Sequence, residues 1–393
     1  MRKTSRLKDL LMLVCIVGVV AGISHFVIAN PLGPSRLLYY AQVPIIQWNT
    51  RCTESAPQWM RTVQRFATST MAAPASQLAF ISKDGTLSHC ETGWKDGILG
   101  DEPLQYDVRF RYASTTKTVT AIAVIGLVND GVLSLDDKII EVLGLSGDFK
   151  DPRVADITIE HLLSHRSGWD RVRTQDAMFM MNHRPWCPST PEKLADTSLL
   201  YAPGEMESYS NLGYCLLGVV IEKVTGKSFR EYVKDSLGKN GSGVEFVDGP
   251  YRSDEVHYDF RHENFYMNNY HQAFDFQALS SSAGLSGSAI ELARIVKASL
   301  ERGPATILDG EMNGDCRPSD IQQCYGYGVY RFQPEALDAP IFMHGGKLPG
   351  VASVVAISSE GDVLVWLGAG SPRPGSGALT EFYQLIHGVL TQH

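Results

Sequence analysis

An apolar stretch near the amino terminus constrains this chain more than any other feature of its sequence. Residues 10–29 contain no charged side chain, and only Ser24 and His25 among them are polar. A helix needs about 20 apolar residues to cross a bilayer, and basic residues before it keep the amino end in the cytoplasm. Residues 1–9 carry four basic residues and one acidic residue. We therefore predict a cytoplasmic tail over residues 1–9 and a transmembrane anchor over residues 10–29.

The same stretch also fits a cleaved signal peptide, since Val27-Ile28-Ala29 resembles a small-residue cleavage site. Its length favours the anchor. In both cases the body of the protein lies outside the cytoplasm, in the periplasm or at the cell surface. The net charge is −8 although the first nine residues are basic, so the body is acidic. Because the body is acidic and has no basic stripe, nucleic acid is not expected as a partner. The expected partner is the membrane, which the amino-terminal segment contacts.

Cysteine usage agrees with export to an oxidising compartment. Six cysteines follow the apolar stretch, and six cysteines allow 15 pairings that a sequence alone does not resolve. We predict that Cys316 and Cys324 pair, because they are close together in a polar loop. A buried free thiol remains open for Cys215, which lies in an apolar helical stretch. No Cys-x-x-Cys spacing occurs, so no zinc site of that type is expected.

The chain after the apolar stretch divides into a linker and one large domain. Residues 30–56 contain Pro31, Gly33, Pro34 and Pro44, which predict an irregular linker. The domain then covers residues 57–393. Near its start the pattern predicts a hairpin, formed by Gln77–Ser82 and Thr86–Thr92. Near its end it predicts three strands, Pro340–His344, Val351–Ser358 and Asp362–Gly368, and then a closing helix, Ala378–Leu390.

Strands at both ends of the domain enclose a middle region, about residues 136–299, with several helical patterns. This order predicts an α/β (α+β) fold: an antiparallel sheet built from both termini, flanked by helices, with a mainly helical inserted subdomain. A 393-residue chain contains enough apolar residues to bury a core of this size.

The first candidate for chemistry is a serine followed three positions later by a lysine. On a helix these two side chains share a face, and a lysine amine can then take the proton of a serine nucleophile. The pattern occurs three times, starting at Ser5, Ser114 and Ser236. Ser5 lies in the basic tail, and the spacer after Ser236 contains a glycine. We select Ser114 with Lys117, because this pair opens the apolar helix predicted over residues 114–128.

Two further patterns follow at a distance. Tyr209-Ser210-Asn211 offers a tyrosine that can move protons and an amide that can hold a carbonyl. The alternative for Tyr209 is a core aromatic, and Tyr266-Met267-Asn268 matches the same pattern. His344-Gly345-Gly346 ends a predicted strand, where glycines let the backbone approach a ligand closely. The alternative there is a glycine turn beside a surface histidine.

In this order the three patterns resemble the three motifs of the serine β-lactamases and penicillin-binding proteins. The chain is similar to the branch with class C β-lactamases, D-alanyl-D-alanine carboxypeptidases, D-aminopeptidases and esterases, over about residues 78–390. Secondary signatures of the branch lie at Ile159–Gly168, Ala202–Gly204, Ala283–Ser286 and Tyr325–Gly328.

The resemblance implies a role for each residue. Ser114 forms an acyl-enzyme, while Lys117 and Tyr209 move protons. Which of these two is the primary base stays open. Asn211 orients the acyl amide, and His344 faces the site and supports Tyr209 or a substrate carboxylate. The third motif ends at Gly346, and the N–H of the next residue, Lys347, joins that of Ser114 in holding the oxyanion. His161 and His165 are expected to be structural.

The third motif departs from the family pattern, because His344 stands where many members carry lysine. A histidine is mostly neutral at pH 7, so it attracts a substrate carboxylate weakly. We therefore expect a peptidase or esterase acting on a small molecule or peptide, with a peptidoglycan-derived peptide as one candidate. A β-lactamase and a non-catalytic penicillin-binding or scaffold protein are the alternatives. No cofactor and no metal are expected, although Tyr251–His271, a predicted cavity-lining loop, contains three histidines.

Overall fold

The computed structural model describes residues 2–171, 173, 177–179, 184–263, 272–310, 316–321 and 323–391, without the side chains of residues 2–7 and 177. The chain divides into two compact units, Met1–Ile45 and Ile46–His393. The second unit contains all of the strands that the structure describes. The residues predicted to carry chemistry also lie in this unit.

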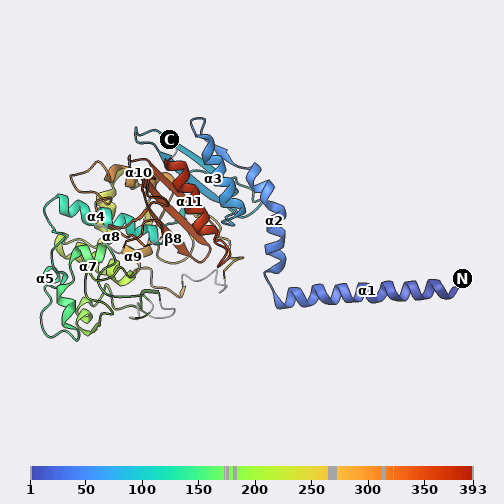
Figure 1. Cartoon of the computed structure of the whole chain (residues 1–393), viewed down its shortest axis with the longest axis horizontal. Coiled ribbons are helices and arrows are strands. Elements are labelled where there is room, and N and C mark those ends of the chain that lie inside the picture. Colours follow the sequence, from blue (N-terminus) through green and yellow to red (C-terminus); the bar gives the residue numbers. More distant parts are fainter. Residues whose placement is uncertain are drawn as a thin grey trace. The chain divides into compact units, whose positions relative to one another are not determined.

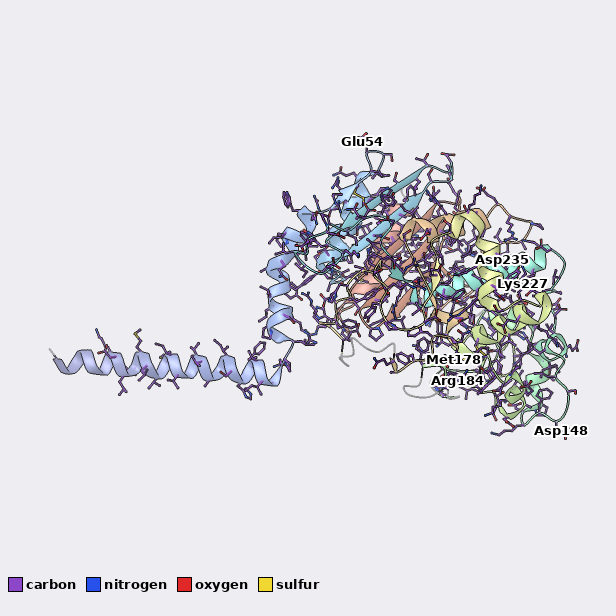
Figure 2. The ribbon with its side chains drawn as sticks, turned by 180° about the vertical axis from the view of Figure 1, so that it is seen from behind. Glu54, Asp148, Met178, Arg184, Lys227 and Asp235 are labelled. Atoms are coloured by element: carbon purple, nitrogen blue, oxygen red, sulfur yellow. A yellow bond between two sulfur atoms is a disulfide. The ribbon has the colours of Figure 1, made fainter. Side chains whose placement is uncertain are left out.

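The first unit is helical. Helix α1 spans Arg2–Ala29, and its part from Lys8 to Ala29 is long and apolar enough to cross a membrane. The apolar side chains of α1 project from the helix on all sides and are exposed (Figure 2). Such a surface on a helix is typical of a segment that lies in a lipid bilayer or is removed as a signal.

The prediction of irregular structure across residues 30–56 is wrong. Helix α2 spans Gly33–Trp48 and includes Pro44, and strand β1 follows at Arg51–Cys52. Pro34 lies in the first turn of α2, where the backbone N–H groups have no partner within the helix, so its missing N–H costs nothing. Strand β1 pairs with β3 (Leu87–Thr92), and the large unit therefore begins before residue 57.

The large unit is built on a seven-stranded sheet in the order β1-β3-β2-β10-β9-β8-β7, with every neighbouring pair antiparallel. Its strands come from both ends of the chain, as predicted. The hairpin of β2 and β3 turns at Gly85, whose φ of +83° favours glycine. The remaining strands of this sheet are β2 Ser76–Ile81, β3 Leu87–Thr92, β7 Tyr330–Phe332, β8 Ile341–Leu348, β9 Val351–Ser358 and β10 Val363–Gly368.

Helices cover both faces of this sheet. Along β10, Trp366 packs with α3 (Gln58–Ser69) and α11 (Ala378–Thr391), whereas Val365 packs with α10 (Ala289–Ser299) on the other face. Successive residues of a strand point to opposite faces, so one apolar strand serves two cores. Figure 1 shows α11 lying across the sheet, in red, with α3 beside it.

The chain between β3 and β7 forms the mainly helical insertion, which confirms the predicted fold class. It carries a small sheet in the order β4-β6-β5. Its elements are β4 Phe110–Arg111, α4 Thr116–Asn129, α5 Ile139–Leu143, α6 Ile159–Leu163, α7 Asn211–Thr225, α8 Phe229–Leu237, β5 Glu245–Phe246, α9 Ser280–Ala283, β6 Leu285–Gly287 and α10. The predicted apolar helix at residues 114–128 corresponds to α4 and the short 3₁₀ turn Ala113–Thr115 before it.

Three disulfides cross-link the large unit: Cys52–Cys90, Cys187–Cys215 and Cys316–Cys324. The last of these confirms the predicted pair. The alternative of a free thiol at Cys215 is wrong, because its partner lies 28 residues earlier on a loop that packs against α7. That partner cannot be identified from the apolar character of the helix alone.

Candidate active site

Ser114 stands at the corner between β4 and α4. Ala113, just before it, has φ +50°, a conformation that non-glycine residues rarely adopt. This turn redirects the chain from the strand into the buried helix. The carbonyl of Tyr112 accepts hydrogen bonds from Thr115 Oγ1 and from Ser353 Oγ of β9, both at 2.7 Å. The corner is therefore fixed from two sides, and Ser114 stays partly exposed.

Lys117 lies one helical turn after Ser114, as the spacing predicts. Its Nζ donates to Ser114 Oγ at 3.3 Å and to the carbonyl of Ser282 at 2.8 Å. The side chain is fully buried. A buried amine in contact with the hydroxyl of a serine is in the position that a proton acceptor requires.

Tyr209 contacts the same hydroxyl group. Its Oη donates to Ser114 Oγ at 3.0 Å, and Lys117 Nζ lies 4.9 Å from the centre of its ring. Ser210 caps α7 by accepting a hydrogen bond from the Gly213 N–H. Asn211, buried, is the first residue of α7 and follows Tyr209 by two positions. The second sequence pattern is therefore positioned by a helix start.

Strand β8 brings the third pattern to this corner. Gly346 pairs with Ser353, the residue that donates to Tyr112, and Lys347 pairs with Ala352. The side chain of Lys347 is exposed. The structure therefore places Gly346 and Lys347 on the strand that runs beside Ser114.

His344 of β8 is buried, with 1% of its surface exposed. Its ring centre lies 6.4 Å from that of Tyr209, and its Nδ1 lies 2.8 Å from the carbonyl of Gly345. Loss of solvent, reinforced by the charge of Lys117, lowers the pKa of His344 to about 3. Nδ1 therefore carries the proton and donates to Gly345, which leaves Nε2 as an acceptor that cannot bind a carboxylate.

Sequence reasoning classified His165 as structural, but the structure places it against the candidate site. Its ring centre lies 4.3 Å from that of Tyr209 and 4.2 Å from that of Tyr325. Its Nδ1 accepts a hydrogen bond from the Ser210 N–H at 3.3 Å. Burial, with a smaller contribution from the charge of Lys117, lowers the pKa of His165 well below its usual value. The other histidine of that segment, His161, is structural as expected, since it forms the capping box of α6.

Sequence reasoning also missed Arg171. Its Cζ lies 5.3 Å from the centre of the Tyr209 ring, and its backbone N–H donates to the carbonyl of Tyr209 at 3.3 Å. Nothing in the local pattern distinguishes this arginine from its neighbours, because the contact is made across 38 residues of chain.

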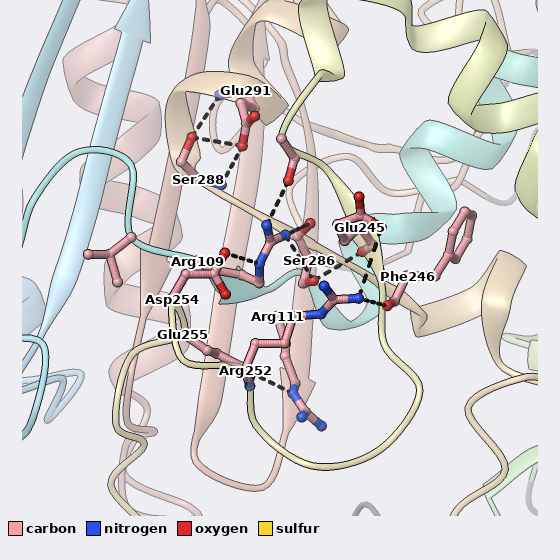
Figure 3. Close-up of polar contacts among 12 residues, drawn as sticks. Arg109, Arg111, Glu245, Phe246, Arg252, Asp254, Glu255, Ser286, Ser288 and Glu291 are labelled. Carbon is pink, nitrogen blue, oxygen red and sulfur yellow. Dashed lines mark hydrogen bonds and ion pairs between the residues drawn. The ribbon is translucent and has the colours of Figure 1, made fainter.

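Two arginines tie β4 to the segment expected to line a cavity (Figure 3). Arg111 Nε bonds to Glu255 at 2.7 Å, and Arg109 Nε bonds to Asp254 at 3.0 Å. Tyr258, also buried, donates to Glu255. The described part of that segment, residues 251–263, thus supports the strand before Ser114, and residues 264–271, with Tyr266, Asn268 and His271, lie outside the described residues. Within the described chain no group of three metal-ligating side chains occurs.

Comparison with known proteins gives a consistent result. The β-lactamase family model matches residues 63–384. Probable fimbrial assembly protein FimD, serogroup H1, from Dichelobacter nodosus is 35% identical over 373 residues, which are 95% of this chain and 94% of that protein. Esterase EstB from Burkholderia gladioli is 34% identical over 168 residues, 38% of this chain and 41% of the esterase.

Among solved structures, D-amino acid amidase from Ochrobactrum anthropi SV3 complexed with L-phenylalanine has a similar fold. The TM-score is 0.64, and the match covers 85% of this chain and 98% of that chain. At 21% identity this likeness shows a shared fold and no more.

Proposed function

Because this chain belongs to the β-lactamase family, we propose that it is a serine hydrolase that cleaves an amide or ester through a covalent acyl-enzyme on Ser114. The proposed substrates are of the D-amino-acid peptide or ester type. The observation that carries the proposal is the position of Ser114 Oγ, which lies 3.3 Å from Lys117 Nζ and 3.0 Å from Tyr209 Oη.

In the acylation step, Ser114 Oγ attacks the substrate carbonyl carbon and loses its proton to the unprotonated member of the Lys117–Tyr209 pair. The backbone N–H groups of Ser114 and Lys347 hold the resulting oxyanion, and Asn211 orients the acyl group. The bond to the leaving amine or alcohol then breaks. Tyr209 delivers a proton to that leaving group, which therefore departs on the Tyr209 side.

In the deacylation step, a water molecule attacks the same carbonyl carbon. The pair of Lys117 and Tyr209 accepts one proton of the water. The oxygen of the water becomes part of the released acid. Ser114 Oγ regains a proton as its bond to the acyl carbon breaks. The site thus returns to its starting state without a cofactor or metal.

His344 argues for a peptidase or esterase over a dedicated β-lactamase. Its pKa of about 3 keeps it neutral throughout the working pH range, so the third motif lacks the cation that would hold the carboxylate of a β-lactam. The similarity to esterase EstB supports the same choice.

We place this activity in the cell envelope. The apolar helix at the amino terminus and the three disulfides support a body outside the cytoplasm. The match to a protein named for fimbrial assembly over nearly its whole length supports the same location, since fimbriae are surface structures. Peptides from the cell wall are then among the accessible substrates.

The proposal is tested by mass spectrometry of the purified protein after incubation with acyl-D-Ala-D-Ala peptides, D-amino amides, short esters and β-lactams. We expect an acyl adduct on the Ser114 peptide with at least one ester or D-amino substrate, and none in Ser114→Ala. Absence of both adduct and turnover with every class would support the alternative of a non-catalytic scaffold protein.

A further inference from the structure

We infer that Arg171 determines specificity by binding an anionic group on the leaving-group side of the substrate. This inference rests on the proposed function, because it names the substrate class of the same site. The exposed guanidinium group lies 5.3 Å from the ring centre of Tyr209, whose hydroxyl group contacts Ser114. The cation therefore lies beside the tyrosine whose hydroxyl group contacts the proposed nucleophile.

The position of Arg171 is fixed by its backbone and by its neighbour. Its N–H donates to the carbonyl of Tyr209 at 3.3 Å, and Asp170 accepts a hydrogen bond from Ser208 Oγ at 2.8 Å. Two successive residues of one segment therefore bind two successive residues of the other. The cation is thus held beside Tyr209 by contacts that do not use its side chain.

Among the residues that the structure describes, no side chain or carbonyl accepts a hydrogen bond from the guanidinium group of Arg171. No carboxylate of the described residues forms an ion pair with Arg171. The nearby acids have other partners: Asp170 accepts from Ser208 and from the Arg173 N–H, and Glu207 accepts from the Tyr325 N–H. The planar fork of an arginine side chain matches the two oxygens of a carboxylate.

The mechanism indicates which part of the substrate meets this cation. Tyr209 protonates the leaving group, so that group lies beside Tyr209, and Arg171 lies over the same ring. Neither His344, which is neutral, nor Lys117, which is fully buried, offers an exposed cation to the leaving group. The preferred substrates therefore carry their negative charge on the leaving group, as a peptide does when its last residue has a free carboxylate.

Two aryl esters of the same shape test the inference, 4-acetoxybenzoate and 4-acetoxybenzamide, which differ in the charge of the leaving group. We expect the full-length protein to prefer the carboxylate by about 10-fold in kcat/KM, mainly through a lower KM. Arg171→Gln should bring the ratio of the two kcat/KM values to about 1, and this ratio, not the rate with either ester alone, is the readout. Arg173→Gln is the matched control: it removes an equal exposed charge whose guanidinium contacts Tyr201 instead, and it should keep the preference.

Labelling of Ser114 by a fluorophosphonate in each variant separates this inference from the proposed function. If Ser114 is labelled and the kcat/KM ratio of the two esters is the same in Arg171→Gln as in the wild type, Arg171 does not bind the anionic leaving group. If Arg173→Gln loses the preference to the same extent, the preference comes from the general positive charge of the surface and not from Arg171. If Ser114 is not labelled and neither ester is hydrolysed, the proposed function itself fails, and the inference fails with it.

Discussion

The backbone nitrogen of Ser114 lies directly against Gly346 of β8: a Cβ atom on this glycine would stand 2.9 Å from that nitrogen and 2.6 Å from the carbonyl oxygen of Tyr112. Neither backbone atom can move aside without displacing the corner that holds the nucleophile. Glycine at this position is therefore required by the close approach of the strand to Ser114. We propose that the same approach brings the N–H of Lys347 to the oxyanion.

The change Gly346→Ala should slow acylation of Ser114 by roughly 10²–10³-fold, the usual effect of losing one oxyanion donor. The added methyl group forces β8 away from the Ser114 corner. The rate of fluorophosphonate labelling measures this effect. Gly126→Ala in α4 is the matched control, since its Cβ would have 3.7 Å to its nearest neighbour, and an unchanged rate in Gly346→Ala would contradict the proposed oxyanion site.

The change Ser114→Ala should abolish labelling by a fluorophosphonate or penicillin probe, whereas Ser236→Ala should leave it intact. Ser236 matches the same sequence pattern, but its Oγ donates to the carbonyl of Val233 at 2.8 Å in the last turn of α8. Peptide mapping locates the label. A label on Ser236, or one that survives Ser114→Ala, would overturn the mechanism.

The change His344→Lys should raise β-lactam acylation relative to hydrolysis of 4-acetoxybenzamide, because it adds a cation at the third motif. A charge about 4 Å from a carboxylate is worth on the order of 4 kcal/mol at an effective dielectric constant of 20. In the wild type we expect no gain in β-lactam acylation between pH 8 and pH 5, since the pKa of His344 is about 3. Acid activation centred near pH 6.5, or an unchanged ratio in the variant, would show that this residue does not set the substrate class.

The protein should lose stability as the pH falls below about 6.5, because His165 and His344 are buried in their neutral forms. Their pKa values in the folded protein lie below that of an unfolded histidine, so the unfolded chain binds protons first. The stability is complete above pH 6.5 and falls by about 1.4 kcal/mol per histidine and pH unit, down to about pH 3 for His344. Urea denaturation at pH 7 and pH 5 measures this slope. His344→Gln should reduce this slope, and an equal slope in that variant would contradict the assignment.

The mature amino terminus should precede Leu10, and the protein should sediment with membranes, if α1 is an uncleaved anchor. The apolar part of α1, from Lys8 to Ala29, is long enough to span a bilayer. Amino-terminal sequencing of the purified protein gives the answer. A sequence that begins at Asn30 would show a cleaved signal peptide instead.

The sequence by itself determined the features that depend on neighbours along the chain. The spacing of Ser114 and Lys117 implies a shared helix face, and the β2–β3 hairpin follows from two strand patterns around Gly85. The order of the three patterns also identified the family. A local pattern failed at α2, where the prolines of residues 30–56 did not prevent a helix, because only Pro44 lies in its interior.

Only the tertiary structure decided which distant residues meet. It brought Tyr209 to Ser114 from 95 positions away, joined Cys215 to Cys187, and placed Arg171 over the ring of Tyr209. It also decided the charge of His344, since the type of residue sets an ordinary pKa but burial shifts it to about 3. The physical reason is the same in each case: helix and strand geometry follow from spacing along the chain, whereas contact and burial depend on how separate elements pack.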